Sequence, residues 1–597
     1  MKLISRYNLL FFILYLSIIS DTNIKANFLQ LHNLHSKSSC GSSSEKFHCS
    51  EISLLNNGCN SCLPKTFFLP RSQGTNTARW LAGWHRFLAP YKWLCEKNDL
   101  AIQNGSLNMV VEYTRSFNNN SIAEYLFGRN SLSFSGSQVP NRNETEEILA
   151  DYLGLPTSFQ GSMRFNPLIQ NIIVELNYYL ALDTWIPGLY TRIHFPLTIA
   201  LWNLNIKTRE KCPKIRPIFP DCYMSNKDTL QSVQTLSSLQ QAFSGYGLFG
   251  DMNSPFDFGK FAFQPQQKTG IADIYINLGW TRMANQSHYL AFYGQVVIPG
   301  GNKPEGIMFF EPMVGNGRRW EVGAGSEGRI TLFESNRQTL GIYFLGYVNY
   351  RLKAFQIRSF DFKDQGFFSR YMLLKEFNKE HNYAGNMLNA IDYTTKSLRA
   401  GSLVVGDASV KLSYYICNFG FDIGYNIWGT TSEKIHLVKN VYPSDLNHRN
   451  FAFKGTSGVC YRVLNTQTNE IIGEANLNAT SSESTSTSSA LIDNPQVIIP
   501  PNPDIAITWD SPITNNIILA EKSSPIVRID IEDLNKCSAA LPCQLSHKFF
   551  AHIDYTKFAV NWEPEIGVGA EVEFNGRPDL RSTISQWGIW VKGLIAF

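Results

Sequence analysis

From about residue 107 onward, long segments of the chain alternate between apolar and polar side chains. In the segment 172–182, Val174 and Leu176 share one parity, while Glu175 and Asn177 share the other. The same alternation recurs in the segments 270–280, 418–428 and 564–574. A period of two places successive side chains on opposite faces of a β-strand. These segments are ten residues or longer, which exceeds the usual globular strand of about five to six residues and fits the roughly 9–11 residues of a tilted strand that crosses a bilayer.

Tight turns join the alternating segments into pairs. The predicted hairpins are 170–182 with 187–204, 269–282 with 288–299, 318–333 with 339–353, 398–416 with 418–429, and 546–558 with 564–574. The links between these pairs are much longer, at 205–268, 300–317, 354–397, 430–545 and 575–584. A leading strand at 107–117 and a closing strand at 585–597 bring the count to about twelve, within limits of 10 to 14. Short turns at one end and long links at the other are typical of an outer-membrane barrel. We therefore predict an all-β fold, a transmembrane antiparallel β-barrel with short periplasmic turns and long extracellular loops.

The final segment, SQWGIWVKGLIAF, also alternates and finishes on Phe597. A closing strand must satisfy its backbone by pairing with the first strand, and an aromatic ring suits the membrane interface. Ile595 and Phe597 are similar to the C-terminal signal that the barrel-assembly machinery reads, although Gly593 stands one place later than the usual glycine.

Polar side chains on the parity opposite the apolar one are predicted to face the lumen. The candidates are Glu175, Tyr190, Arg192, Asp273, Arg351, Lys353, Lys411, Asp422, Glu571 and Glu573. One interpretation is a watered pore that selects small solutes through rings of charge. The alternative is a plugged or narrow barrel whose interior charges pair with one another. Both signs of charge are present, so no ion preference is predicted.

Aromatic residues near the proposed strand ends are predicted to form girdles at the two membrane interfaces. They are Tyr178, Trp185, Tyr190, Trp202, Trp280, Tyr414, Trp428, Trp562 and Trp587. Within the long links, 228–245 (DTLQSVQTLSSLQQAFSG) is predicted to form a short surface helix. The Ser/Thr-rich run 478–490 cannot bury a core and is expected to be exposed and mobile.

The first 26 residues have the form of a secretory signal peptide. Lys2 and Arg6 precede the apolar run LLFFILYLSIIS, and cleavage is expected after Ser20 or Ala26. An uncleaved anchor helix is the alternative. We divide the remainder into a Cys-containing segment 27–105, periplasmic or plug-like, and a barrel 106–597 with long loops at 205–268, 354–397 and 430–545. No later run of 18 or more apolar residues predicts a transmembrane helix.

Composition supports an exported membrane barrel. Charged residues make up 17% of the chain, below the roughly 25% of soluble domains. The net charge of +4 and the lack of a basic stripe argue against a nucleic-acid partner. A soluble secreted β-protein remains the alternative class.

Eleven cysteines suit an oxidising compartment. Cys59 and Cys62 form a CxxC pair that fits a redox pair, half a zinc site or structural disulfides, of which we favour disulfides. Cys212 with Cys222, and Cys537 with Cys543, have the spacing of local loop staples. We predict no metal and no cofactor.

No catalytic motif is recognisable. Gly323-Ala-Gly325-Ser-Glu-Gly328 fits GxGxxG, but it lies in an alternating segment and not at the start of a helix after a strand, which a dinucleotide site requires. His194 and His288 have no matched Ser and Asp. We therefore predict that the protein is not an enzyme.

Several segments together resemble a family of large predicted outer-membrane barrels. They are ADYLGLP, LALDTWIPGLYTRIHFPLTIALWNLN, RRWEVGAG, FDIGYNIWG, EKIHL and QWGIWVKGLIAF. The family is associated with host-dependent Gram-negative bacteria of the Dependentiae type, and the resemblance runs from about residue 65 to the end. It implies location and fold, and it assigns no activity and no site residues.

The leading hypothesis is a porin-like barrel of the Gram-negative outer membrane that passes small hydrophilic solutes or serves as a major surface protein. The alternatives are an adhesin that uses the barrel as a platform for its loops and, behind it, an outer-membrane hydrolase. The expected partners are outer-membrane lipid, the barrel-assembly machinery and small hydrophilic solutes, and a homo-oligomer is compatible with the sequence.

Overall fold

The computed structural model describes residues 64–83, 105–143, 146–211, 218–219, 223–224, 234–284, 288–335, 337–363, 365–377, 383–438, 449–454, 460–465, 471–476, 505–509, 529–557 and 563–597. The chain divides into two compact units, 1–52 and 53–597, and all described residues belong to the second. The predicted signal peptide, Cys59, Cys62, Cys212, Cys222, Trp562 and the Ser/Thr-rich run lie outside the described residues.

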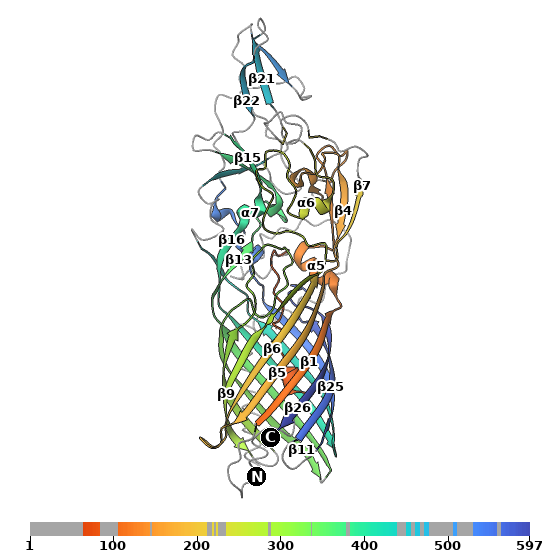
Figure 1. Cartoon of the computed structure of the whole chain (residues 1–597), viewed down its shortest axis with the longest axis vertical. Helices are drawn as coiled ribbons and strands as arrows, with labels where there is room; N and C mark the ends of the chain where they lie inside the picture. The colour runs from red at the N-terminus through yellow and green to blue at the C-terminus, as the bar shows by residue number, and fades with distance from the viewer. Residues whose placement is uncertain are drawn as a thin grey trace, which may run out of the picture. The chain divides into compact units, whose positions relative to one another are not determined.

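Twelve antiparallel strands form a closed barrel (Figure 1). They are β1 (Gly105–Ser116), β5 (Leu168–Ala181), β6 (Leu189–Asn203), β9 (Asp273–Ala284), β10 (His288–Pro299), β11 (Glu321–Ser335), β12 (Gln338–Arg351), β17 (Leu403–Ile416), β18 (Phe419–Thr430), β24 (Gln544–Thr556), β25 (Glu563–Asn575) and β26 (Gln586–Ala596). The predicted strand count and all five predicted hairpins are confirmed.

The barrel closes where β1 pairs with β26. At one end of this seam, the Gly105 N–H donates to the Phe597 carbonyl at 2.7 Å, and the Phe597 N–H donates to the Gly105 carbonyl at 2.9 Å. Closure leaves the wall without an unpaired edge, as a spanning sheet requires. We call the end that carries the five tight turns the short-turn end and the opposite end the long-link end.

Side chains of the wall are sorted by parity, as the alternation predicts. On β25, Ile566 and Val568 point outward and are 62% and 55% exposed, whereas Glu565 and Glu571 point inward and are 4% and 3% exposed. The barrel therefore presents an apolar outer surface and a polar inner one, which is the inverse of a water-soluble protein and typical of a barrel in lipid.

The described parts of the links at the long-link end are folded into strands and short helices. They contain the strands β2 (Ser131–Ser135), β3 (Ile148–Leu149), β4 (Gln160–Arg164), β7 (Lys207–Lys211), β8 (Gln266–Ile271), β13 (Ala354–Ser359), β14 (Leu373–Phe377), β15 (Tyr383–Asn389), β16 (Thr395–Ala400), β19 (Ile435–Leu437), β20 (Asn450–Phe453), β21 (Cys460–Asn465), β22 (Ile471–Asn476) and β23 (Ile505–Trp509). Their helices are α5 (Asn119–Phe127), α6 (Leu239–Phe243), α7 (Ala390–Thr394) and α8 (Lys536–Ala539), with 3-10 turns at Ala150–Leu153, Ser369–Tyr371 and Ile531–Asp533. All these strands except β8, which extends the wall beside β6, form four small sheets.

Aromatic side chains give the links their own core. The rings of Phe243 and Phe261 stack with centroids 4.6 Å apart, and Tyr371 meets Phe243 edge to face. The predicted surface helix in 228–245 is therefore wrong in character: the helix is α6, five residues long, and Leu239, Ala242 and Phe243 on it are buried. Burying these rings stabilises the links through the hydrophobic effect. The barrel wall contributes less of this stabilisation, because many of its inward side chains are polar.

The structure corrects two further expectations. Trp202, Trp428 and Tyr190 are buried inside the barrel instead of lying in an interfacial girdle, because their parity turns them inward; Trp185 and Trp280 are exposed as a girdle requires. The staple between Cys537 and Cys543 is not formed: Cys537 is disulfide-bonded, whereas Cys543 keeps a thiol whose sulfur accepts from Arg577 at 3.6 Å.

The GxGxxG stretch lies inside β11, so it does not open a helix. Gly325 has a packing reason, since a Cβ there would collide with the ring of Tyr293. Among the described residues, no helix is both long and apolar enough to span a bilayer.

Placing a charge in the apolar outer band should destabilise the barrel in lipid. Val568 lies near the middle of β25, between Ile553 and Val591 on the neighbouring strands. We expect Val568→Arg to lower the free energy of unfolding in vesicles by about 2–4 kcal/mol, because the guanidinium would replace an apolar contact with lipid. Denaturant unfolding measures this, with Val568→Leu as the control; equal losses for the two variants would contradict an outward, lipid-facing band.

Candidate functional site

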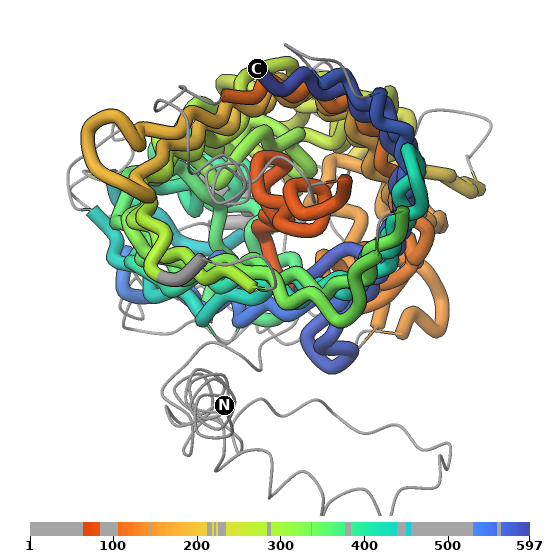
Figure 2. The backbone as a smooth tube through the Cα atoms, turned by 90° about the horizontal axis from the view of Figure 1, so that it is seen from below, coloured from red at the N-terminus to blue at the C-terminus, as the bar shows by residue number. Residues whose placement is uncertain are grey.

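The interior of the barrel is occupied by the chain itself. Residues 64–83, which we call the plug, lie inside the ring of strands, as the red tube in Figure 2 shows. Their sequence, from Pro64 to Gly83, lacks the alternation of a strand and forms only the short helix α3 (Thr77–Leu81). The Asn76 side chain caps α3 by accepting from the Arg79 N–H at 3.1 Å. The division of the chain into a segment 27–105, periplasmic or plug-like, and a barrel stays a prediction, because most of that segment lies outside the described residues.

The plug enters from the long-link end, where backbone and side-chain hydrogen bonds hold it. Lys65 N–H donates to the Tyr125 carbonyl on α5 at 2.9 Å, and Thr66 N–H donates to the Ser538 carbonyl on α8 at 2.8 Å. The Thr66 hydroxyl also donates to Ser359 at 2.6 Å. The folded links therefore fix where the plug begins.

Arg71 and Thr77 bind one wall carboxylate from two sides. Arg71 Nη2 lies 2.7 Å from Asp407 Oδ2, and the Thr77 hydroxyl donates to Asp407 Oδ1 at 2.7 Å. Thr77 Oγ1 is also 2.7 Å from the Ser409 hydroxyl. On the opposite side of the plug, Ser72 donates to Asp273 Oδ2 at 2.6 Å. These contacts involve charged or hydroxyl groups on both partners.

Arg79 of the plug binds two carboxylates of the barrel wall. Its guanidinium forms ion pairs with both Glu112 on β1 and Glu175 on β5, and all three side chains are at most 1% exposed. Trp80 Nε1 donates to Glu175 Oε1 at 2.6 Å, and the Trp80 ring stacks on His194 with centroids 3.9 Å apart. Two buried carboxylates of the wall thus depend on this one arginine of the plug.

Eight of the nine charged residues that the sequence placed in the lumen are buried on the inner face. They are Glu175, Arg192, Asp273, Arg351, Lys411, Asp422, Glu571 and Glu573, and the inward Tyr190 joins them. Lys353 is wrong, because β12 ends at Arg351 and the lysine beyond it is exposed. Whether these residues line a conducting pore stays a prediction.

The wall charges pair with one another across the strands. Arg192 makes two hydrogen bonds to Glu327, at 2.9 and 3.1 Å, and Lys411 lies 2.7 Å from Asp422. Arg351 pairs with Glu321 at 2.6 Å, and Lys548 pairs with Glu571. In this conformation the interior charges pair with one another, as the alternative of a plugged or narrow barrel describes.

One side of the lumen is tyrosine-rich. Trp80 and Leu81 of the plug cluster with Tyr179, Tyr190, Tyr275, Tyr289, Tyr293, Tyr343 and Tyr347. Tyrosine provides an apolar ring for packing and a hydroxyl for hydrogen bonding. On this side the plug therefore packs against aromatic rings, and the tyrosine hydroxyls keep the surface partly polar.

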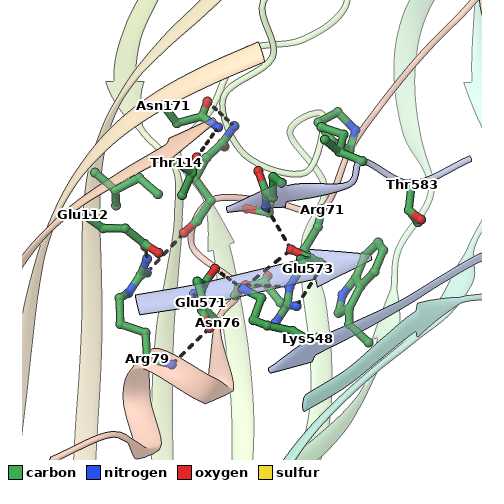
Figure 3. Close-up of a pocket in the computed structure, with 18 residues that line it drawn as sticks. Arg71, Asn76, Arg79, Glu112, Thr114, Asn171, Lys548, Glu571, Glu573 and Thr583 are labelled. Atoms are coloured by element: carbon green, nitrogen blue, oxygen red, sulfur yellow. Dashed lines mark hydrogen bonds and ion pairs between the residues drawn. The ribbon is translucent and has the colours of Figure 1, made fainter. Parts of the chain in front are cut away.

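A small polar pocket with a cavity volume of about 40 Å³ remains between the plug and the wall (Figure 3). Arg71, Asn76 and Arg79 border it from the plug, and Glu112, Lys548, Glu571 and Glu573 border it from the wall. Asn76 Nδ2 donates to Glu571 Oε2 at 3.1 Å across one side of it. The pocket provides donors and acceptors of both signs, and its volume suits a few water molecules.

A buried ion triad closes the site at the long-link end. Glu433 pairs with Arg319 and lies 2.6 Å from Arg358 Nη1, and the Arg358 guanidinium sits over the Phe67 ring at 3.8 Å. Burial alone would raise the pKa of Glu433, but the two guanidinium groups outweigh burial and lower it from 4.5 to about 2. The triad therefore joins β13, the segment after β18 and the first residues of the plug.

The sequence prediction missed Arg71, Arg79, Glu112, Asp407 and the Arg319–Glu433–Arg358 triad. Glu112 and Asp407 lie on inward parities of β1 and β17 and were available to the same reasoning that found Lys411. Arg71 and Arg79 belong to no periodic segment, so no pattern signalled them.

Removing Arg79 from the plug should lower the free energy of unfolding far more than removing an arginine at the surface. We expect Arg79→Ala to lower the free energy of unfolding by about 3–5 kcal/mol, because Glu112 and Glu175 would stay buried without a counter-charge. The exposed Arg577–Asp579 pair supplies the control: Arg577→Ala should change stability by about 0.5 kcal/mol or less. Adding Glu112→Gln and Glu175→Gln to Arg79→Met should restore most of the loss, and denaturant unfolding that finds no restoration would contradict this account.

The Arg319–Glu433–Arg358 triad should make the free energy of unfolding depend on pH in the acidic range. Since the Glu433 pKa is lower in the folded protein than in the unfolded chain, its contribution is present above pH 4.5 and is lost as the pH falls toward 2. We expect wild type to exceed Glu433→Gln in stability at pH 6 and the difference to shrink steadily below about pH 5. Unfolding curves of both proteins over this range measure it; a difference independent of pH would contradict the pairing.

No family model matches the sequence, and no curated protein matches it. Among solved structures, the chain is similar to an outer-membrane channel from Pseudomonas putida F1, at 8% identity and a TM-score of 0.29, covering 84% of this chain and 98% of that one. It is similar to a Pseudomonas aeruginosa FadL homologue at 9% identity and a TM-score of 0.24, covering 89% and 99%. The toluene transporter TodX of Pseudomonas putida gives 8% identity and a TM-score of 0.26, covering 89% and 98%. At such identities and TM-scores the likeness carries no weight for function, and the Dependentiae-type origin stays a prediction.

Proposed function

We propose that the protein is a gated channel of the Gram-negative outer membrane, closed by residues 64–83 and open to small hydrophilic solutes when the plug is displaced. The short-turn end faces the periplasm, and the folded links face the outside. The proposal narrows the porin-like hypothesis, because a lumen that contains the plug does not support free diffusion in this conformation.

The observation that carries the proposal is the chemistry of the plug–wall contact. Arg71, Ser72 and Thr77 meet Asp407, Asp273 and Ser409 through charged and hydroxyl groups. Water can replace such partners, whereas it cannot replace the contacts of an aliphatic core without a large free-energy cost. A wall that provides such polar groups beside the plug is therefore compatible with both a plugged and a hydrated lumen.

The small pocket beside the plug supports the same conclusion. It lies beside the plug at residues that would line a hydrated path after displacement, including Lys548, Glu571 and Glu573. Charges of both signs in this region predict weak selectivity between anions and cations. The expected cargo is a small polar solute.

A surface platform is the second candidate function. It is favoured by the folding of the long links into four small sheets and an aromatic core, since a bare channel needs only short connections. Binding to host cells by a barrel whose plug is covalently locked would support this role independently of conduction.

The gate is tested by loosening the plug and then locking it. Arg71→Gln and Arg79→Gln weaken its ion pairs, and Thr77→Cys with Ser409→Cys places two thiols where hydroxyl oxygens lie 2.7 Å apart, within reach of a disulfide. In planar bilayers we expect the loosened variants to conduct, the loosened and oxidised double-cysteine variant to be silent, and reductant to restore its conductance.

Each single-cysteine variant is the matched control and should conduct with or without reductant. A second variant replaces residues 70–80 with a Gly-Ser linker of equal length, so that the test does not depend on a weakened plug leaving the lumen. Heat modifiability on a detergent gel checks that each barrel is folded. Folded barrels of both kinds without conductance would overturn the gated-channel proposal.

A further inference from the structure

Four side chains that the plug–wall ion pairs do not explain converge near the short-turn end of the lumen. Asp422 lies on β18, His552 and Asp554 lie on β24, and Glu565 lies at the start of β25. Each is at most 4% exposed. One ligand-type atom from each of Asp422, His552 and Asp554 falls within 4.8 Å of the others.

Several polar atoms of this cluster make no hydrogen bond within the part of the chain that the structure describes. They are Nδ1 and Nε2 of His552, both carboxylate oxygens of Glu565, and Oδ1 of Asp422. A buried polar atom without a partner costs about 1–3 kcal/mol, and more for a charged group. Five such atoms in one place indicate a bound species that satisfies them together.

The charges of the cluster do not balance. Asp422, Asp554 and Glu565 face two ammonium groups, those of Lys411 and Lys592. Lys411 binds Oδ2 of Asp422 at 2.7 Å, and Lys592 donates to the Ala82 carbonyl of the plug. With a neutral His552 and three ionised carboxylates, one negative charge remains, which a bound cation would balance.

Distances within the cluster suit coordination. His552 Nδ1 lies 3.5 Å from Asp554 Oδ2 and 3.9 Å from Asp422 Oδ2. Ligands at about 2.0–2.1 Å from a tetrahedral Zn²⁺ lie about 3.3 Å from one another, so small side-chain adjustments suffice. Tyr415 donates to Asp554 at 3.3 Å, an outer hydrogen bond of the kind that orients metal-binding carboxylates.

We propose that Asp422, His552 and Asp554 form the core of a buried site for a divalent transition-metal ion of the Zn²⁺ class. One imidazole nitrogen with carboxylates is a donor set that suits Zn²⁺ better than Ca²⁺ or Mg²⁺, which prefer oxygen alone. Glu565, whose two carboxylate oxygens make no hydrogen bond among the described residues, is the candidate for the fourth ligand.

Gly83, the last described residue of the plug, contacts this site. Gly83 N–H donates to Asp422 Oδ2 at 2.7 Å, and a Cβ at Gly83 would lie 2.7 Å from the His552 ring and 2.8 Å from Glu565 Oε1. Gly83 has φ +68°, a conformation that glycine adopts without strain. Resting on the proposed gating function, we infer that the bound ion holds the inner end of the plug, so that chelation favours opening.

The metal is tested on the purified full-length protein in detergent. After chelator treatment, equilibrium dialysis against Zn²⁺ and elemental analysis should show one more zinc per chain in wild type than in His552→Gln, with at least a 100-fold loss of affinity at this site. His547→Gln is the matched control, since His547 is on the same strand with its ring bonded to Tyr425 at 2.6 Å, and it should bind like wild type.

Zinc bound by cysteines elsewhere contributes equally to wild type and variants, so it cancels in the comparison. If His552→Gln fails the heat-modifiability check, Glu565→Gln provides the same test. Zn²⁺ should also raise the thermal midpoint of wild type and His547→Gln but not of His552→Gln. Equal zinc content in wild type and both site variants would overturn the proposed metal site. Water or a proton would then occupy the cluster in place of a metal ion.

The gating role has a separate readout. Chelation should increase the open time of the loosened Arg71→Gln channel, and Zn²⁺ should reverse the increase. Zinc binding without any effect on open time would overturn the gating role and leave the site standing. Zinc binding in barrels that never conduct would instead overturn the proposed function.

Discussion

Arg79 lies in the lumen between Glu112 and Glu175, and neither the plug nor the wall could bury these charges without the other. The constraint behind this interaction is the closed wall. A strand that turns alternate side chains toward lipid must turn the others inward, so the apolar surface lies outside and the polar groups share a narrow interior. Those groups need water or protein partners, since an unpaired buried charge costs several kcal/mol. The plug supplies partners that the wall alone lacks.

The same constraint explains where the apolar core is. Inside the wall, the plug makes apolar contacts in two clusters. Ala78 and Ala82 pack against Val110 and Trp590, and Trp80 and Leu81 pack against the tyrosine-rich side. The large core lies among the long links, where no lipid competes for apolar side chains. The molecule therefore separates two kinds of stabilisation, with aromatic packing in the links and hydrogen-bonded ion pairs in the lumen. The start of the plug connects them, because Phe68 belongs to the link core while Arg71, three residues later, binds the wall.

Local periodicity explains which parts of this arrangement were predictable. Hairpins and inward residues such as Glu571 follow from a period of two that any ten-residue window reveals. Lys353 failed because parity holds only while the strand lasts, and β12 ends two residues earlier. Trp202 and Trp428 failed because parity outweighed the interfacial preference of tryptophan. The plug site was beyond reach for a different reason: Arg71 meets Asp407 336 positions away, and Gly83 meets Asp422 339 positions away, so no local pattern encodes the contact.

The seam between β1 and β26 has a consequence for assembly. The two strands border the longest loop of chain in the barrel, so the pairing that closes the wall carries the largest loop-closure entropy. Before that pairing forms, the strand that carries Glu112 is an edge strand on that side. Residues 64–83 precede β1, so Arg79 is synthesised before any carboxylate that it will neutralise. The plug is thus available as a counter-ion for the wall carboxylates from the start of barrel closure.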